Sequence, residues 1–288
     1  MLKTLRILSV QQWLKNGLIL IPALFATSEW SWDLVEQLIV GVFGFSLLTS
    51  AVYINNDLVD LKLDRLHPVK KYRLIASGQV AQNKGRFFAI VFFLVGITLL
   101  YLLSWKAATA GLSYVVLNLL YSFFGKHIPI LDLVFISFGY IIRLLIGSYL
   151  ATVPLSIWVI IVVCMLSFYL VLLKRYGDVL LYKEEGIITR RTVEFYARFN
   201  LRLAAFIFVQ LILVVYLIYI IYVFGDLENG MNYLAYSSVP LAYFALFRYN
   251  NKALNSAQHD PISILLKDIV AVCLLVVSFV VLIIALYS

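Results

Sequence analysis

The long uninterrupted apolar runs are what most limit the folds open to this chain. If runs of roughly 17–25 apolar residues are membrane spans, the sequence predicts nine helices, at about 14–28, 33–55, 84–103, 107–124, 130–150, 155–173, 203–224, 231–248 and 267–287. The chain is 63% hydrophobic and 13% charged, whereas soluble chains are about 45–50% apolar and about 25% charged. The runs are continuous and do not alternate, which excludes a transmembrane barrel. We therefore predict an all-α polytopic membrane protein with nine transmembrane helices.

The basic residues sort strongly to one side of this predicted topology. All but two of the 23 Lys and Arg residues lie in segments on the side of the N-terminus. The exceptions are Lys106, on the other side, and Arg143, inside a span. The positive-inside rule then predicts a cytoplasmic N-terminus and an outside C-terminus. The net charge of +8 follows from this distribution and gives no reason to expect a nucleic-acid partner.

The chain shows no linker or low-complexity tract, so we expect one domain over residues 1–288. The first apolar run, 17–27, lacks a small-residue cleavage site and is interpreted as a retained span, not a signal peptide. Cys164 and Cys273 lie in apolar runs without metal-ligand spacing, which favours packing roles. Two inside segments, 56–83 and 174–202, begin with acidic residues and continue with basic ones. Their spacing suggests an ancient parallel duplication, although no residue-level repeat is visible.

The inside segment 56–83 opens with three aspartates, Asp57, Asp60 and Asp64. On one α-helix their spacing places them within roughly 60° of one another. Carboxylate oxygens suit Mg²⁺, which is commonly held by one or two carboxylates and substrate phosphates. We expect Pro68 to end the helix and turn the following basic residues back as a loop. The residues suited to surround those phosphates are His67, Lys70, Lys71 and Arg73.

The alternative for this acidic stripe is a solvated helix end with local pairs between aspartates and basic residues. Three carboxylates on one face at the mouth of a membrane helix are costly without a function. A Mg²⁺-diphosphate site is therefore the favoured interpretation.

The second segment, 174–202, is dominated by lysine and arginine. Lys174 and Asp178 are four residues apart, so a simple helical salt bridge is one interpretation, and basic residues flanking a membrane face often snorkel. The other interpretation is a clamp for a second phosphate group. Its residues are Lys174, Arg175, Asp178, Arg190, Arg191 and Tyr196.

Arg143 lies within the predicted span 130–150, in the sequence YIIRLLIG with Tyr140. An arginine at membrane depth usually marks a functional cavity, and a structural partner elsewhere in the bundle is the alternative. Asp132 is on the same predicted helix but eleven residues away, too far for direct contact. At the cytoplasmic entrance of the first span, we expect Lys15 and Asn16 to reach the head-group site.

The sequence from Asn56 to Asp64 fits the pattern NDxxDxxxD, and Arg65, His67, Pro68, Lys70, Arg73 and Ala76-Ser77-Gly78 continue it. It resembles the UbiA superfamily of intramembrane prenyltransferases. The resemblance implies nine transmembrane helices in the cell membrane and a Mg²⁺-dependent site on the cytoplasmic side. Within the superfamily, the chain looks most like the decaprenyl-phosphate phosphoribosyltransferases over nearly its whole length. The segments that carry this likeness are QWLKN, YIIRLLIG, KRYGD, RRTVEFY and DPISILLKD.

Two positions depart from the pattern, with Asp178 in place of a glutamate and Leu74 where many members have proline. The resemblance implies transfer of 5-phosphoribose from phosphoribosyl pyrophosphate to a polyprenyl phosphate, with release of pyrophosphate, for a cell-envelope sugar lipid. Aromatic prenyltransferases of the superfamily carry a second aspartate-rich motif. Here Asp178 stands alone, and Glu184 and Glu185 lie too far on to complete such a motif. One acidic and one basic pole suit a donor with a diphosphate at one end and a 5-phosphate at the other.

Two rival functions stay open: a prenyltransferase acting on an aromatic or porphyrin acceptor, and a transporter or lipid-binding protein without chemistry. The expected partners are Mg²⁺, phosphoribosyl pyrophosphate and a polyprenyl phosphate, and a homo-oligomer is compatible with the sequence. The expected catalytic residues are Asp57, Asp60, Asp64, Lys70 and Arg73, with the three aspartates as metal ligands. The expected substrate-binding residues are Lys15, Asn16, Asn56, His67, Tyr140, Arg143, Lys174, Arg175, Asp178, Arg190 and Tyr196.

Overall fold

The computed structural model describes residues 10–25, 30–66, 70–186, 188, 190–225, 231–255 and 261–287. Every regular element in these ranges is a helix, which confirms the predicted all-α class. The chain divides into two compact units. Unit 1 comprises Met1–Lys126 and Phe138–Leu155, and unit 2 comprises His127–Ser137 and Ser156–Ser288.

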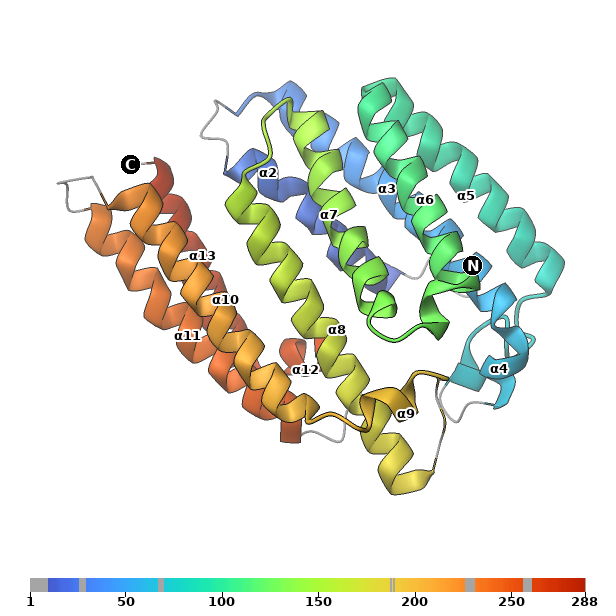
Figure 1. The fold of residues 1–288 in the computed structure, drawn as a ribbon. Coiled ribbons are helices and arrows are strands. Elements are labelled where there is room, and N and C mark those ends of the chain that lie inside the picture. Colours follow the sequence, from blue (N-terminus) through green and yellow to red (C-terminus); the bar gives the residue numbers. More distant parts are fainter. Residues whose placement is uncertain are drawn as a thin grey trace. The chain divides into compact units, whose positions relative to one another are not determined.

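Unit 1 is built around the long helix α3, which packs along α5 and also contacts α6 and η1 (Figure 1). Ser31 caps α3 by accepting a hydrogen bond from the Leu34 amide at 3.2 Å, a favourable N-terminal residue. Ser104 separates α5 from α6 and caps α6 in the same way. The elements are η1 (Val10–Leu20), α2 (Ile21–Leu24), α3 (Trp32–Val59), α4 (Leu61–Leu66), η2 (Lys70–Tyr72), α5 (Gln82–Leu103), α6 (Trp105–Phe123), η3 (Gly125–His127) and most of α7 (Leu131–Ala151).

Close backbone approaches hold unit 1 together. A Cβ atom at Gly96 would lie 2.6 Å from the Gly44 carbonyl oxygen, so α3 and α5 can meet only because both positions are glycine. A Cβ atom at Gly147 would collide with the carbonyl group of Ile19. The contact at Gly147 fixes η1 against α7, and both elements carry predicted site residues.

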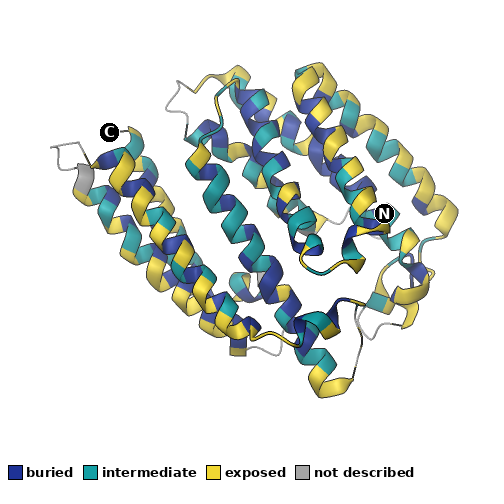
Figure 2. Cartoon of the chain, viewed as in Figure 1, coloured by how far each residue is buried: buried dark blue, intermediate teal, exposed yellow. Residues whose placement is uncertain are grey.

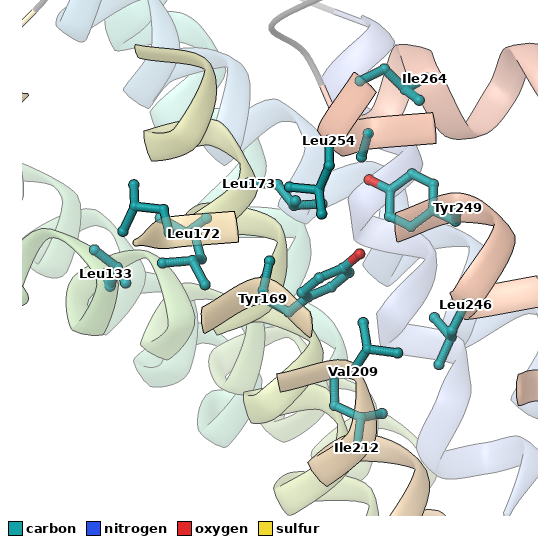
Figure 3. Close-up of a cluster of buried hydrophobic side chains, with 14 of the residues drawn as sticks. Leu133, Tyr169, Leu172, Leu173, Val209, Ile212, Leu246, Tyr249, Leu254 and Ile264 are labelled. Carbon is teal, nitrogen blue, oxygen red and sulfur yellow. The ribbon is translucent and has the colours of Figure 1, made fainter. Parts of the chain in front are cut away.

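Unit 2 contains the start of α7 and the remaining helices. Its apolar core gathers side chains of α8, α10 and α11, as Figure 3 shows. Within this core the Tyr169 hydroxyl donates to Asn250 Oδ1 at 3.0 Å. The helices are α8 (Ile157–Glu185), α9 (Val193–Tyr196), α10 (Leu201–Phe224), α11 (Met231–Asn255), α12 (Pro261–Lys267) and α13 (Ile269–Tyr287).

Seven helices in the described ranges are long and apolar enough to cross a membrane: α3, α5, α6, α7, α8, α10 and α13. Large apolar side chains are exposed along their outer faces (Figure 2), including Ile90 at 60% and Leu102 at 74%. Exposed apolar surface on this scale requires lipid. The protein is therefore a multi-pass membrane protein. The other two predicted spans fall on η1 with α2 and on α11, which contains Pro240, and the total of nine with its orientation stays a prediction.

Two boundaries differ from the sequence-based expectation. The acidic stripe is not on one helix, because α3 ends at Val59, Asp60 is its C-terminal cap, and α4 starts at Leu61. The break precedes Pro68, which lies outside the described residues. In the segment expected to be a loop from residue 174, α8 continues to Glu185 and ends at Gly186, whose φ of 67° suits glycine.

Candidate functional site

Two aspartates of unit 1 converge on one arginine nitrogen. Arg73 Nη1 lies 2.8 Å from Asp57 Oδ1 and 2.9 Å from Asp64 Oδ2. Asp57 belongs to α3, Asp64 to α4, and Arg73 follows η2. The Asp64 side chain is 5% exposed, whereas that of Arg73 is 42% exposed. Asp64 is therefore buried in the protein, whereas the Arg73 side chain that pairs with it is partly exposed to solvent.

The loop that carries Arg73 is held by its own apolar residues. Ile75 and Ala76 are buried against Ile54 and Leu61, and Arg65 Nε donates to the Ala76 carbonyl at 3.3 Å. The chain then turns at Gly78, whose φ is 75°. The predicted return of the basic segment to the aspartates is confirmed for Arg73.

The third aspartate has a different partner. Asp60 Oδ1 lies 2.5 Å from Lys126 Nζ, and Ser122 Oγ donates to Asn56 Oδ1 at 2.6 Å. Ser122 lies near the end of α6, and Lys126 lies in η3. The sequence analysis assigned neither residue to the site. The signal that could have identified Lys126 is its position as a single basic residue directly after an apolar span.

The aspartates around Arg73 provide only some of the ligands that a divalent cation needs. Among the described residues no group of three or more His, Cys, Asp or Glu side chains is placed to hold a metal ion. Asp57 and Asp64 nevertheless direct one oxygen each at a single cationic nitrogen. Two carboxylates supplemented by substrate phosphates are the usual protein ligands of Mg²⁺. Of the other predicted residues, His67 lies outside the described ranges and Lys70 is half-buried in η2.

Arg143 is buried in unit 1 among neutral groups. Its Nε donates to Asn16 Oδ1 at 2.9 Å, Nη1 to the Gly139 carbonyl at 2.6 Å, and Nη2 to the Tyr114 hydroxyl at 3.4 Å. Its Cζ lies 5.0 to 5.6 Å from three ring centroids, those of Tyr114, Phe45 and the predicted Tyr140. We call this arrangement the Arg143 cage. Asn16, Phe45, Tyr114, Gly139, Tyr140 and Arg143 make up the cage.

The predicted N-terminal residues dock on a polar face of α3. Asn16 is fully buried, and its amide nitrogen donates to Ser46 Oγ at 2.9 Å and Thr49 Oγ1 at 3.2 Å. Lys15 Nζ donates to Gln12 Oε1 at 2.8 Å. The same face of α3 leads toward Asp57, because positions three, four and seven apart share a helix face.

In unit 2, Arg175 forms buried ion pairs with two aspartates. Its Nε lies 2.8 Å from Asp132 Oδ2 and its Nη1 lies 2.5 Å from Asp178 Oδ2. The side chains of Arg175 and Asp132 are 1% and 0% exposed. Asp178 also lies 3.9 Å from Arg190 Nε. The Asp132 carboxylate, which the sequence could not pair with Arg143, therefore has its own partner.

Tyr196 completes this network. Its hydroxyl donates to Asp132 Oδ1 at 2.5 Å and accepts from the Ile130 amide at 2.9 Å. Burial, together with the hydrogen bond to Asp132, raises the pKa of the Tyr196 hydroxyl well above its ordinary value. The hydroxyl therefore stays protonated as the donor to Asp132. Several cationic side chains of this segment reach the surface: Lys174, Lys183, Arg191, Arg198 and Arg202 are exposed, and Arg190 is half-buried.

The described geometry thus brings the predicted residues into three groups: the acidic group around Arg73, the Arg143 cage with η1, and the Arg175 network. Comparison with known proteins gives a consistent result. The profile of the UbiA prenyltransferase family matches residues 18–267. The chain is 30% identical to the decaprenyl-phosphate phosphoribosyltransferase of Mycobacterium tuberculosis over 262 residues, which cover 90% of this chain and 85% of that protein.

The corresponding enzyme of Corynebacterium glutamicum is 31% identical over 206 residues, 70% of this chain and 61% of that protein. A UbiA homologue from Archaeoglobus fulgidus, solved bound to GPP and Mg²⁺, superposes with a TM-score of 0.70 at 17% identity. That alignment covers 97% of this chain and 99% of that chain.

Proposed function

Because the chain belongs to the UbiA prenyltransferase family, a family of enzymes, we propose that it transfers 5-phosphoribose from phosphoribosyl pyrophosphate to a polyprenyl phosphate. The observation that carries the proposal is the convergence of Asp57, Asp64 and Arg73. It occurs in a chain similar over most of its length to proteins named decaprenyl-phosphate phosphoribosyltransferase. The product would supply a cell-envelope sugar lipid.

The acidic group would bind the pyrophosphate end of the donor. Asp57 and Asp64 would hold Mg²⁺ with the pyrophosphate oxygens, and Asp60 would complete the anionic wall. The ion would neutralise charge on the leaving group. Lys70 and Arg73 would donate hydrogen bonds to the same phosphates, while Asn56 and His67 would contact the donor beside them. Arg73 is suited to this role because its exposed guanidinium already bridges the two carboxylates.

The reaction would be a displacement at C1 of the ribose. An oxygen of the lipid phosphate forms the new bond to C1, and the C1–O bond to pyrophosphate breaks with its electron pair going to pyrophosphate. The lipid phosphate has a second pKa of about 6, so it attacks as an anion without a general base. Charge stabilisation by Arg73 and Lys70 and correct placement of the two substrates would supply the rate enhancement.

The basic segment of unit 2 would bind a substrate phosphate group. Of its cations we propose Lys174, which is exposed, and Arg190, which is half-buried, for this role. Arg175, Asp178 and Tyr196 were expected to bind substrate, and their contacts with Asp132 and with one another support a role in holding this segment in shape. Tyr140 and Arg143 would contribute to acceptor binding in unit 1.

We further propose that residues 1–288 form one UbiA-type transmembrane domain in the cell membrane, with nine spans and the site on the cytoplasmic side. The family match crosses both compact units. The sorting of basic residues supports a cytoplasmic N-terminus and an outside C-terminus. Single-cysteine labelling of Lys106→Cys from outside the cell, and its absence for Lys71→Cys, would be the expected result, and the reverse pattern would overturn the orientation.

The function is tested with purified protein, radiolabelled phosphoribosyl pyrophosphate and decaprenyl phosphate, with Mg²⁺ or with EDTA. We expect a labelled lipid product and pyrophosphate release in Mg²⁺ and neither in EDTA. A parallel reaction contains geranyl diphosphate and 4-hydroxybenzoate. Product in the parallel reaction alone would replace the proposal with an aromatic prenyltransferase, and product in neither would favour a protein without this chemistry.

A further inference from the structure

The positive charge of Arg143 has no anionic partner among the described residues. Its three hydrogen bonds end on an amide oxygen, a backbone carbonyl and a tyrosine hydroxyl, all neutral. The residue is 3% exposed and lies in a membrane-spanning helix. A buried cation without a counter-charge is costly, so a structure that keeps one points to a missing anion.

The contacts of Arg143 leave part of its guanidinium available. A guanidinium has five N–H donors, and the bonds to Asn16, Gly139 and Tyr114 use one on each nitrogen. One N–H on each terminal nitrogen remains. These remaining N–H groups are the donors that a guanidinium offers to phosphate oxygens.

Asn16 holds the guanidinium in place without neutralising it. Its amide nitrogen is tied to Ser46 and Thr49, which fixes its carbonyl oxygen toward Arg143 Nε. An aspartate would occupy the same space and compensate the charge. The neutral residue at this position keeps the cation oriented and its charge available.

A second cation without a carboxylate partner among the described residues is Lys15, which hydrogen-bonds Gln12. Gln12 Oε1 also accepts from the Tyr53 hydroxyl at 3.4 Å, so Lys15 lies on the face of α3 that Asn16 contacts one turn away. Together Lys15 and Arg143 supply two positive charges. A phosphate monoester carries about −1.5 to −2 at neutral pH, which is the complementary charge.

The position of this pair suits the acceptor better than the sugar donor. Arg143 is about 18 Å along α7 from its first residue, inside an apolar span, where a headgroup carried by an apolar chain can be delivered. Thr49, beside Asn16, is about 12 Å along α3 from Asp57. With the donor's pyrophosphate at Asp57, an acceptor phosphate near Arg143 would approach from the far side of C1.

We propose that Arg143 and Lys15 bind the phosphate group of an isoprenoid monophosphate, the acceptor of the proposed function on which this inference rests, and that Asn16 is the positioning residue of Arg143. The guanidinium carbon lies over the three aromatic rings of the cage, which shield it from water. The remaining N–H groups of the terminal nitrogens would donate to the phosphate.

The test measures equilibrium binding of radiolabelled farnesyl phosphate and farnesol to the purified full chain, without sugar donor or Mg²⁺. The wild type binds the phosphate at least about tenfold more tightly than the alcohol. Asn16→Asp abolishes this preference because the new carboxylate takes the charge of Arg143. The matched control, Asn200→Asp, adds the same charge at the cap of α10, where aspartate is equally suitable, and keeps the preference.

A retained phosphate preference in Asn16→Asp overturns the proposal. If Asn16→Asp does not fold, Arg143→Lys and Arg143→Gln carry the test: the lysine variant keeps more of the preference than the glutamine variant, and equal preference overturns the site. The readout is independent of catalysis. Normal binding without transfer from phosphoribosyl pyrophosphate would reject the proposed function and leave the site, whereas transfer with unchanged binding in all variants would reject the site alone.

Discussion

Among the residues that the structure describes, each compact unit buries one arginine, and the two arginines have opposite charge environments. Arg175 in unit 2 contacts two carboxylates, Asp132 and Asp178. Arg143 in unit 1 contacts only neutral groups and aromatic rings. Burial by itself therefore does not reveal the role of a membrane-embedded cation. An arginine that is paired with carboxylates stabilises the fold, whereas an arginine with only neutral partners keeps its charge for an anionic ligand.

The largest effect on stability should come from replacing Arg175, and not Arg143, by an apolar residue of similar size. Arg175→Met leaves the fully buried Asp132 carboxylate without its cation, which costs about 3–5 kcal/mol. Arg143→Met removes hydrogen bonds only from neutral groups, which costs about 1–2 kcal/mol. Unfolding of the detergent-solubilised variants by denaturant titration measures both. Equal losses in the two variants would remove the distinction between the arginines.

The acidic group of unit 1 should affect activity more than stability. Asp57→Asn keeps the size of the side chain but removes the charge that is directed at Arg73, and we expect pyrophosphate release to fall about 10²–10³-fold. Asp33→Asn is the matched control, because it lies at the other end of the same helix and is exposed. If the Asp57→Asn variant released pyrophosphate at the same rate as the control variant, Asp57 would have no role in the reaction.

A smaller effect on stability is expected from Tyr196→Phe in unit 2. The change removes the hydroxyl that donates to Asp132 and accepts from the Ile130 amide. The fully buried Asp132 carboxylate then loses this partner, a cost of about 1–3 kcal/mol. Thermal unfolding in detergent measures it. Phe195→Leu, which changes only the neighbouring apolar contact, is the comparison. Unchanged stability with a selective rise in KM for the sugar donor would instead make Tyr196 a substrate ligand.

The smallest effect should come from Asp268 of unit 2, a buried carboxylate that pairs with two half-exposed cations. Asp268 accepts from Arg248 at 2.9 Å and contacts Lys252 at 3.1 Å. Burial alone would raise the pKa of Asp268, but these hydrogen bonds and the Ala271 amide outweigh it and lower the pKa below its ordinary 3.8.

A lowered folded-state pKa means that Asp268 contributes stability above about pH 4. That contribution is lost as the pH falls through the folded-state value. Both cations are about half exposed, so the effect should be about 1 kcal/mol or less. We expect the difference in melting temperature between wild type and Asp268→Asn to be present at pH 6 and to shrink below pH 4. A difference that grows on acidification would show that the pKa is raised.

Local sequence signals identified much of the acidic site. The spacing of Asp57, Asp60 and Asp64 and the basic residues after them depend on neighbours within about twenty positions, so a pattern could detect them. The pattern could not show that α3 breaks at Asp60, because Asp60 turns toward Lys126, a residue from another helix. Lys126 and Asp132 were missed for the same reason: their partners are distant in the chain.

The sequence alone determined the all-helical membrane class, most of the spans and the family, because apolar run length, charge sorting and motif spacing are properties of contiguous residues. Only the tertiary structure decided which charges are compensated. Arg143 lies within a long apolar run and Arg175 lies beside Lys174 at the end of another, and neither position shows which groups its guanidinium meets. The groups that distinguish them are Asn16, which meets Arg143 from η1, and Asp132, which meets Arg175 from α7. Chain folding brings these groups together over long sequence separations, and no local pattern encodes which pairs will meet.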